Sequence, residues 1–216
     1  MSTSLIRTLQ LADSAFPSGG FAYSWGLEAA IALGLVDAKS FDGWLANDMA
    51  CRWGSFDRPA LAMAFRADDP KAVDWDVDTR IFAEPLRVRS AQAGQAFLTA
   101  TARLGDPVAT MMRDAILDRQ TPGHLPVAQG AVLKSMGLSL EEALAAAAHT
   151  AAQGTTSAAV RLGVVGAIGA QRLLASLAST LGELSAPPDP AVRPASFTPI
   201  AEIAMLSAPS GALFAN

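Results

Sequence analysis

Three aspartates at alternate positions form the densest acidic group in the chain. Asp74, Asp76 and Asp78 have the spacing with which a calcium-binding loop begins. The glycine that such a loop needs next is missing, because Thr79 follows Asp78, and Pro85 occupies the twelfth position, where a bidentate glutamate belongs. We therefore expect these aspartates to form an exposed acidic face of a helix rather than a cation site.

Histidine and cysteine, which proteins use most often to hold zinc or nickel, are scarce. His124 and His149 are the two histidines and lie far apart, with no HExxH, CxxC or histidine-rich tract. We expect His124 at a loop or helix start, His149 in a core or an interface, and no metal or cofactor held by this chain alone. Cys51, the one cysteine, allows no disulfide within the chain and favours a buried structural thiol.

Sequence motifs for nucleotide binding and acyl transfer are also missing. The chain has no GxxxxGK[ST] phosphate-binding loop, no GxGxxG fingerprint and no GxSxG nucleophile turn. Its formal net charge of −4 and its pI of about 5.1 exclude the basic footprint of a nucleic-acid-binding protein. We therefore predict no catalytic residue and no nucleic-acid partner.

The richest concentration of special residues is the segment 11–28, which reads LADSAFPSGGFAYSWGLE. Asp13 can cap a helix or start a turn, and Pro17 fixes one backbone angle. Gly19 and Gly20 permit a positive φ. The segment therefore predicts a turn between two helices.

Aromatic and acidic side chains follow this turn. We expect Tyr23, Trp25 and Glu28 to project from a helix, with Trp25 and Glu28 on one face because they are three residues apart. The residues alone leave two interpretations open, a packed joint between helices or a binding site. An acid–base pair of Glu28 with Tyr23 in a cleft would be the enzymatic version of the second.

The elements that must position these residues read as helices. Alanine is very frequent, and strict two-residue alternation of apolar residues is hard to find. Helix starts are indicated by Asp69-Pro70, Asp106-Pro107 and Thr198-Pro199, and by a capping box from Ser139 to Glu142. We predict an all-α, single-domain fold of about ten helices, at roughly 4–12, 21–33, 40–55, 58–67, 70–84, 86–104, 107–119, 125–136, 140–152, 155–181 and 199–206.

Residues 120–185 carry few charges, which is unusual for surface helices. Within them, Gly163, Gly166 and Gly169 recur at three-residue spacing in an expected helix. Each glycine costs about 1 kcal/mol relative to alanine in a helix interior. The stripe therefore predicts a close helix crossing, packed centrally or across a dimer interface.

The chain divides by composition into two parts. We predict an all-helical domain at 1–185 and a proline-rich C-terminal tail with one short helix at 186–216, since prolines are frequent after residue 185. We see no secretory signal and no apolar run long enough to span a membrane, and expect a cytoplasmic protein with no membrane partner.

Three blocks of sequence carry a resemblance to a known family. The run LADSAFPSGGFAYSWGLEAA resembles the N-terminal signature of the urease accessory protein UreF family, with matches at Asp13, Pro17, Gly19, Gly20, Ser24, Gly26, Leu27 and Glu28. A second block is Arg89-Ser90 with Gly94. A third runs from His124-Leu125-Pro126 and Gly130 through 157–163 and Gly166 to Gln171 and Leu174. The order and spacing hold over most of the chain.

The resemblance implies an all-α homodimer that is not an enzyme. It implies a complex with the UreD scaffold (also called UreH) and the GTPase UreG, which acts on apo-urease so that nickel enters the urease active site. The residues it implies for partner binding are Asp13, Pro17, Gly19, Gly20, Ser24, Glu28, Arg161, Gly166 and Phe214. We expect Glu28 and the turn 17–20 on the GTPase-facing surface, and charge reversal at Glu28 to weaken UreG recruitment with helical content intact.

The sequence departs from the family pattern in two places. Val164 and Ala167 stand where the family commonly has Pro and Gln, and the tail lacks the family's His-Glu pair and basic ending, although Phe214 keeps an apolar anchor. Either the tail docks differently from that of the family, or the partner surfaces have changed, and we expect a mostly extended tail when the protein is alone. The alternatives to an accessory protein are the helical enzyme described above and a generic dimeric scaffold unrelated to urease.

Overall fold

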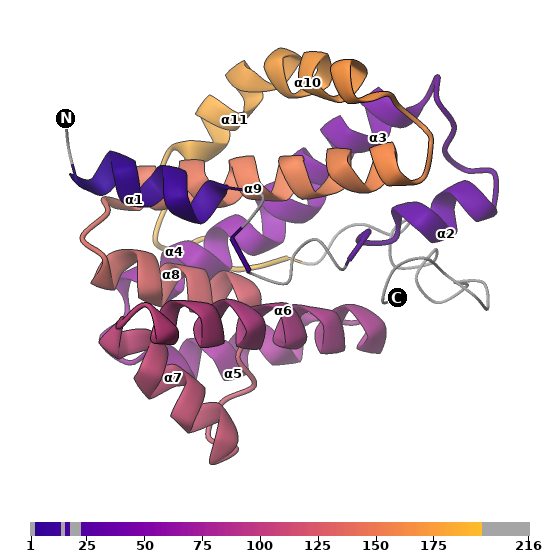
Figure 1. The fold of residues 1–216 in the computed structure, drawn as a ribbon. Helices are drawn as coiled ribbons and strands as arrows, with labels where there is room; N and C mark the ends of the chain where they lie inside the picture. Colours follow the sequence, from indigo (N-terminus) through magenta and orange to yellow (C-terminus); the bar gives the residue numbers. More distant parts are fainter. Residues whose placement is uncertain (1–2, 14–15, 18–22, 196–216) are drawn as a thin grey trace.

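The computed structural model describes residues 3–13, 16–17 and 23–195, and over these ranges the chain forms helices and no strand. The all-α prediction is thus confirmed (Figure 1). The elements are α1 (Thr3–Ala12), α2 (Leu27–Ala32), α3 (Phe41–Asn47), the π-helix η2 (Asp48–Asp57), α4 (Arg58–Arg66), α5 (Pro70–Arg80), α6 (Glu84–Arg103), α7 (Pro107–Leu117), α8 (Leu125–Ser135), α9 (Leu140–Arg161), α10 (Ala167–Ser176) and α11 (Ala178–Ser185).

Helix α9 is the centre of the molecule. It packs against α1, α10 and α11 on one side and against α4, α8 and η2 on the other (Figure 1). Its start is fixed by the predicted capping box, in which the Glu142 N–H donates to Ser139 Oγ at 3.2 Å and the Ser139 N–H donates to Glu142 Oε2 at 2.8 Å. Small buried alanines let its neighbours approach. Helix α9, which lies within the charge-poor stretch 120–185, is therefore a central core helix.

Helix α8 packs closely against α6 and α4, and a glycine at each contact permits this: Gly94 of α6 and Gly130 of α8. A Cβ on Gly94 of α6 would collide with the Gly123 carbonyl and lie 2.7 Å from the Leu125 nitrogen. A Cβ on Gly130 of α8 would collide with the Leu61 carbonyl. In both places the obstacle is main chain, so the backbones of α6, α8 and α4 are in direct contact.

The predicted helix over 155–181 is wrong, and within the chain Gly163 and Gly166 make no close crossing; a crossing across a dimer interface stays a prediction. Helix α9 ends at Arg161, where Gly163 takes a left-handed φ of 74° and the Val164 N–H bonds back to the Ala159 carbonyl at 3.0 Å. This is a Schellman C-cap, in which glycine avoids the strain of a left-handed Cβ. Gly166 is the N-cap residue of α10, and no heavy atom stands within 4 Å of a Cβ built on Gly163 or Gly166. The glycines therefore make a corner.

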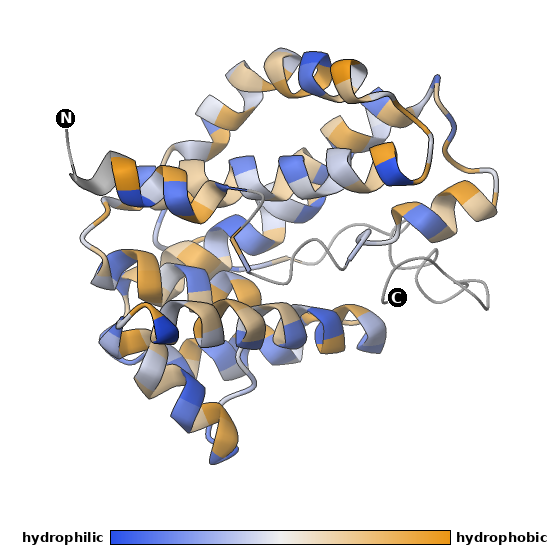
Figure 2. Ribbon diagram, in the orientation of Figure 1, coloured by the Kyte–Doolittle hydropathy of each residue, from blue (hydrophilic) through white to orange (hydrophobic). Residues whose placement is uncertain are grey.

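Helices α10 and α11 form an outer layer over α9, and α3, η2 and α4 form one continuous helical stretch. Hydrophobic and hydrophilic residues follow one another along α10 (Figure 2), and Ile168 in it is 69% exposed.

Residues 186–195 run back along the other side of the core: Arg58 Nη2 donates to the Ala186 carbonyl at 2.6 Å, and Ser55 Oγ donates to the Ala195 carbonyl at 3.0 Å. Residues 196–216, including the expected helix at 199–206, lie outside the described residues. No described helix is both long and apolar enough to span a bilayer.

Candidate functional site

Of the signature segment, residues 11–30, the structure describes 11–13, 16–17 and 23–30, and Phe16 lies against Phe97 of α6. The Phe16 N–H donates to the Asp13 carbonyl at 2.9 Å, which closes a tight turn, and the Phe16 ring is buried 6.1 Å from the ring of Phe97. This anchor leaves the side chains of Asp13 and Pro17 exposed. Gly19 and Gly20 lie outside the described residues.

An open cleft of about 790 Å³ lies between the end of α1, this turn and α6. Amide side chains alternate with apolar ones along it, and Asp13 and Arg103 contribute one charge of each sign. The lining residues are Gln10, Asp13, Phe16, Pro17, Gln92, Gln95, Ala96, Thr99, Ala100, Arg103 and Leu104. A surface of this composition suits contact with another polypeptide, because aromatic and arginine anchors with hydrogen-bonding groups are typical of interfaces.

The expected helix from residue 21 begins only at Leu27, because two left-handed residues precede it. Trp25 has a φ of 51° and Gly26 a φ of 87°. With the Leu27 N–H donating to the Ser24 carbonyl at 3.1 Å, residues 24–27 form a type I′ turn. Trp25 therefore does not share a helix face with Glu28. A tryptophan in the left-handed region costs roughly 1–2 kcal/mol, so neighbouring contacts must hold it there.

Glu28 is buried rather than surface-facing. Its residue exposure is 8%, and its backbone N–H lies 3.4 Å from the oxygen of buried Ser24, which accepts from it. This burial contradicts the surface position expected for Glu28, and charge reversal there should disturb the fold, because a lysine at a buried position must desolvate its charge. Tyr23 donates to Gln92 Oε1 at 3.2 Å, and neither Tyr23 nor Glu28 is among the residues that line the large cleft.

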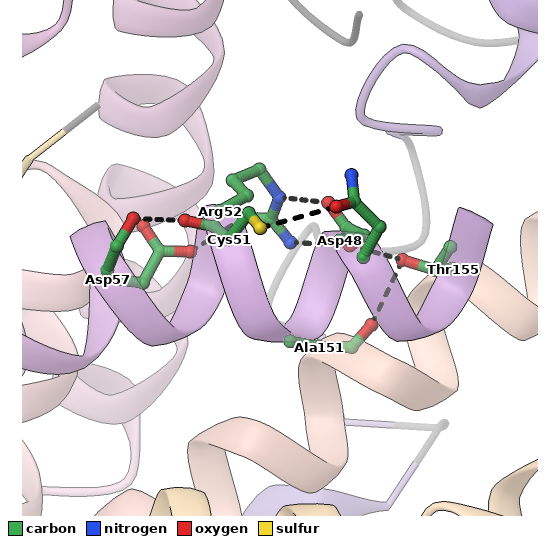
Figure 3. Close-up of polar contacts among 8 residues, drawn as sticks. Asp48, Cys51, Arg52, Asp57, Ala151 and Thr155 are labelled. Carbon is green, nitrogen blue, oxygen red and sulfur yellow. Dashed lines mark hydrogen bonds and ion pairs between the residues drawn. The ribbon is translucent and has the colours of Figure 1, made fainter. Parts of the chain in front are cut away.

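Arg52 forms an ion cluster with Asp48 and Asp57 on η2 (Figure 3). Arg52 of η2 donates through Nε to Asp48 Oδ1 at 2.6 Å and through Nη1 to Asp57 Oδ2 at 2.6 Å. Its guanidinium carbon lies 5.2 Å from the centroid of the Trp25 ring. Thr155 of α9 donates to Asp48 at 3.4 Å, which connects the cluster to the central helix.

Burial and pairing act against each other on the pKa values of this cluster. Burial lowers the pKa of Arg52, but the charges of Asp48 and Asp57 outweigh it, so that the pKa is raised and Arg52 stays charged. Burial raises the pKa of Asp57 above 3.8, and Arg52 offsets only part of that rise. A small cavity of about 60 Å³, lined in part by Asp13, Trp25, Arg52 and Asp57, borders the cluster.

The expected acidic face of α5 is wrong at Asp74, which is fully buried. One Asp74 oxygen accepts from Thr121 Oγ1 at 2.6 Å and from the Gly123 N–H at 2.5 Å, and the other accepts from the His124 N–H at 2.9 Å. Asp74 thereby satisfies backbone donors where α8 begins. Burial raises its pKa, against the bond from Thr121 and the nearby His124. Asp76 instead pairs with Arg80 at 2.9 Å near the surface.

His124 is the N-cap residue of α8, as the prediction of a helix start required. Its ring is buried, with Nε2 3.0 Å from Asp78 Oδ1. His149 is exposed on α9, so it does not lie in the core, and its expected place in an interface stays a prediction. Cys51 is half-buried and donates to Asn47 Oδ1 at 3.2 Å rather than lying in the core. In the described part of the chain, no three His, Cys, Asp or Glu side chains are placed to hold a metal ion.

The remaining site candidates divide between two places. Asp13 and Pro17 share the large cleft, and buried Ser24 and Glu28 support the turn beside it. Arg161 and Gly166 lie exposed at the corner between α9 and α10, and neither lines the cleft. Phe214 lies outside the described residues.

Sequence reasoning missed Arg52 altogether. The signal that could have found it is the spacing of Asp48 and Arg52, which are four residues apart and therefore neighbours on a helix. The tryptophan–glycine pair just before a helix start was a second available signal, since glycine at such a position indicates a left-handed turn.

Comparison with known proteins places the chain in a family. A UreF family model matches residues 35–178, a region that begins after the signature segment. Proteins named urease accessory protein UreF are similar over most of their length. The one from Cereibacter sphaeroides (strain ATCC 17029 / ATH 2.4.9) is 37% identical over 86% of this chain and 84% of the relative. The relative from Agrobacterium fabrum is 35% identical over 84% of this chain and 81% of its own length. The relative from Paenarthrobacter aurescens is 33% identical over 76% of this chain and 75% of its own length. The helical fold described above and these matches together show that the chain belongs to the UreF family.

Proposed function

We propose that this chain is an accessory protein for the maturation of urease by nickel insertion, and that it works in complex with a UreD (UreH) scaffold and the GTPase UreG on apo-urease. Family membership is the observation that carries this proposal, because the relatives are named urease accessory proteins. As a member of this family the chain is an accessory factor rather than an enzyme, which answers the enzymatic alternative. We further propose a cytoplasmic homodimer.

The cleft between the signature segment and α6 supports docking through this face. It combines exposed Asp13 and Pro17 with three glutamines and the apolar side chains of Phe16 and Leu104. Buried Phe16 holds the turn from below, so its exposed residues are presented on a firm base. A preformed surface loses less conformational entropy when a partner binds than a loose one does.

Deletion of the gene in a urease-positive host tests the proposed function. We expect urease activity to be lost, to return with a plasmid copy, and to return in part when excess nickel is supplied. The purified chain should also co-purify with UreD and UreG from that host. Full ureolysis in the deletion strain would contradict the proposal and favour a scaffold unrelated to urease.

A further inference from the structure

The type I′ turn at residues 24–27 needs an explanation, because it places a tryptophan where glycine or asparagine is usual. Trp25 has the left-handed φ of 51° and is partly exposed. Backbone strain of this kind persists only where surrounding contacts over-determine the conformation, and it is common where a protein presents a functional surface. The contacts that hold Trp25 therefore identify the residues that set the shape of this segment.

Arg52 supplies those contacts from below. All three guanidinium nitrogens are engaged in its plane by carboxylate oxygens: Nε and Nη2 with Asp48 at 2.6 and 3.1 Å, and Nη1 with Asp57 at 2.6 Å. The flat face of the guanidinium is left for the Trp25 ring, whose centroid is 5.2 Å away. A cation held in this way attracts the electron-rich face of an indole.

The chain of contacts continues from Trp25 to the wall of the cleft. The Trp25 and Tyr23 ring centroids are 5.8 Å apart, and the Tyr23 hydroxyl donates to Gln92 Oε1 at 3.2 Å. Gln92 is exposed on α6 and lines the cleft of about 790 Å³ together with Asp13 and Pro17. Arg52 is thus connected to the candidate docking face through two aromatic rings.

We propose that Arg52 is a positioning residue for partner docking: clamped by Asp48 and Asp57, it holds Trp25 in its left-handed turn and so fixes the signature segment against α6. This inference rests on the proposed function. It goes beyond it by assigning a role to a buried residue that touches no partner. It also explains why a buried carboxylate, Asp48, and a half-buried one, Asp57, both meet Arg52 at η2, since a single one would leave the guanidinium free to turn away from the ring.

A purely structural role would predict the same contacts, so the test must separate binding from stability. In the triple variant Asp48→Asn, Arg52→Met and Asp57→Asn, all three charges are removed together. Neutral replacement of a whole buried ion group often leaves a protein as stable or more stable, whereas removal of one member strands the others. The variant Trp25→Leu removes the other half of the contact and leaves the ion cluster intact.

The dissociation constant for purified UreD is measured by isothermal titration calorimetry, and urea unfolding is followed alongside. We expect the triple variant to unfold at a urea concentration no lower than that of the wild type, and to bind UreD roughly tenfold more weakly, a difference of about 1.4 kcal/mol. Trp25→Leu should weaken binding to a similar extent. The two changes combined should weaken binding no further than either alone, because they break one contact.

A matched control removes a surface ion pair with the same spacing. Asp76→Asn with Arg80→Met takes away the pair between these residues on α5, and this variant should bind UreD like the wild type. If the triple variant fails to fold, the cycle with Trp25→Leu is run with Arg52→Lys, which keeps the positive charge but not the flat face. Wild-type affinity in a folded cluster variant, or additive losses in the cycle, would overturn the inference. A wild-type chain that does not bind UreD would instead overturn the proposed function.

Discussion

At the scale of single residues, four buried or half-buried carboxylates do different work. Asp48 and Asp57 hold Arg52, whereas Asp74 accepts from the backbone where α8 begins and Asp78 meets His124. Because their charges are removed from water, each depends on a partner from elsewhere in the chain or on the next turn of its helix. Substitutions at these aspartates should therefore differ sharply from substitutions at exposed ones.

Asp74→Ala should lower the free energy of unfolding by about 3 kcal/mol or more, because it strands two buried backbone donors and the Thr121 hydroxyl. Urea unfolding at neutral pH measures this loss. Asp76→Ala on the same helix is the control. It removes only a half-exposed ion pair, and the loss should stay below about 1 kcal/mol. Equal losses for the two variants would show that Asp74 does not cap α8 in solution.

Asp57→Asn should change how stability depends on pH. Burial raises the folded-state pKa of Asp57 above 3.8, so the folded chain holds this proton more tightly than the unfolded chain does. Ionisation of Asp57 therefore subtracts stability as pH rises from about 4 through the folded pKa. The asparagine variant lacks that loss, so its stability relative to the wild type should increase as pH rises to neutrality. Urea midpoints at several pH values measure the two slopes, and parallel slopes would contradict this.

At the scale of elements, the sequence predicted what local chemistry determines. The caps at Asp69, Asp106 and Ser139 all accept from backbone N–H groups of the first helical turn, as expected. These bonds join residues two or three positions apart, so the information is local. The burial of Asp74 depends on a loop 47 to 50 residues away, and the sequence carried no sign of that contact.

The site was predictable only in part for the same reason. Asp13 and Pro17 could be assigned to a turn from their residue types, and the structure places both on one cleft. Glu28 lies on α2, which packs against α9, and the clamp on Trp25 depends on η2. Both α9 and η2 are distant in sequence, so neither feature could be read from the signature itself. The prediction of one helix through Gly163, Gly166 and Gly169 was wrong because a spacing of three residues fits both a helix face and a C-cap followed by a new helix start.

Gly94→Ala should destabilise the chain by roughly 1–3 kcal/mol or more, since its Cβ collides with main-chain atoms that cannot move aside singly. Gly154→Ala in α9 is the matched control. No atom stands within 4 Å of its Cβ, so alanine should stabilise that helix by about 0.5–1 kcal/mol. Thermal unfolding of the two variants decides the matter. A stabilised Gly94→Ala would mean that α6 and α8 lie further apart than described.

At the scale of the whole molecule, the core and the candidate docking face share Phe16, but most of the residues that line the cleft lie outside the core. The central helix α9 and the α4–α8–α6 crossings hold the fold together, while the cleft lies on one side of α6 and carries exposed polar groups. A substitution on the cleft can therefore change binding without changing stability. A substitution at buried Glu28 should instead lower the stability of the fold.

Asp13→Lys should weaken co-purification of UreD by about tenfold in a variant that thermal unfolding shows to be folded, because reversing an exposed interfacial charge opposes a complementary partner surface. Asp118→Lys at the end of α7 is the control, since Asp118 is also exposed but is not among the residues that line the cleft. Quantitative pull-down measures both. Equal retention of the partners by the two variants would move the docking face elsewhere on the molecule.

The backbone contacts of α8 limit how this protein can be repaired once damaged. In most cores an oversized side chain can be accommodated by a second substitution that makes a neighbouring side chain smaller, which is how second-site suppressors usually arise. At Gly94 and Gly130 the obstructing atoms include the carbonyl oxygens of Gly123 and Leu61, which no substitution can shorten. Suppressor screens starting from alanine at either glycine should return true revertants or changes that shift a whole helix.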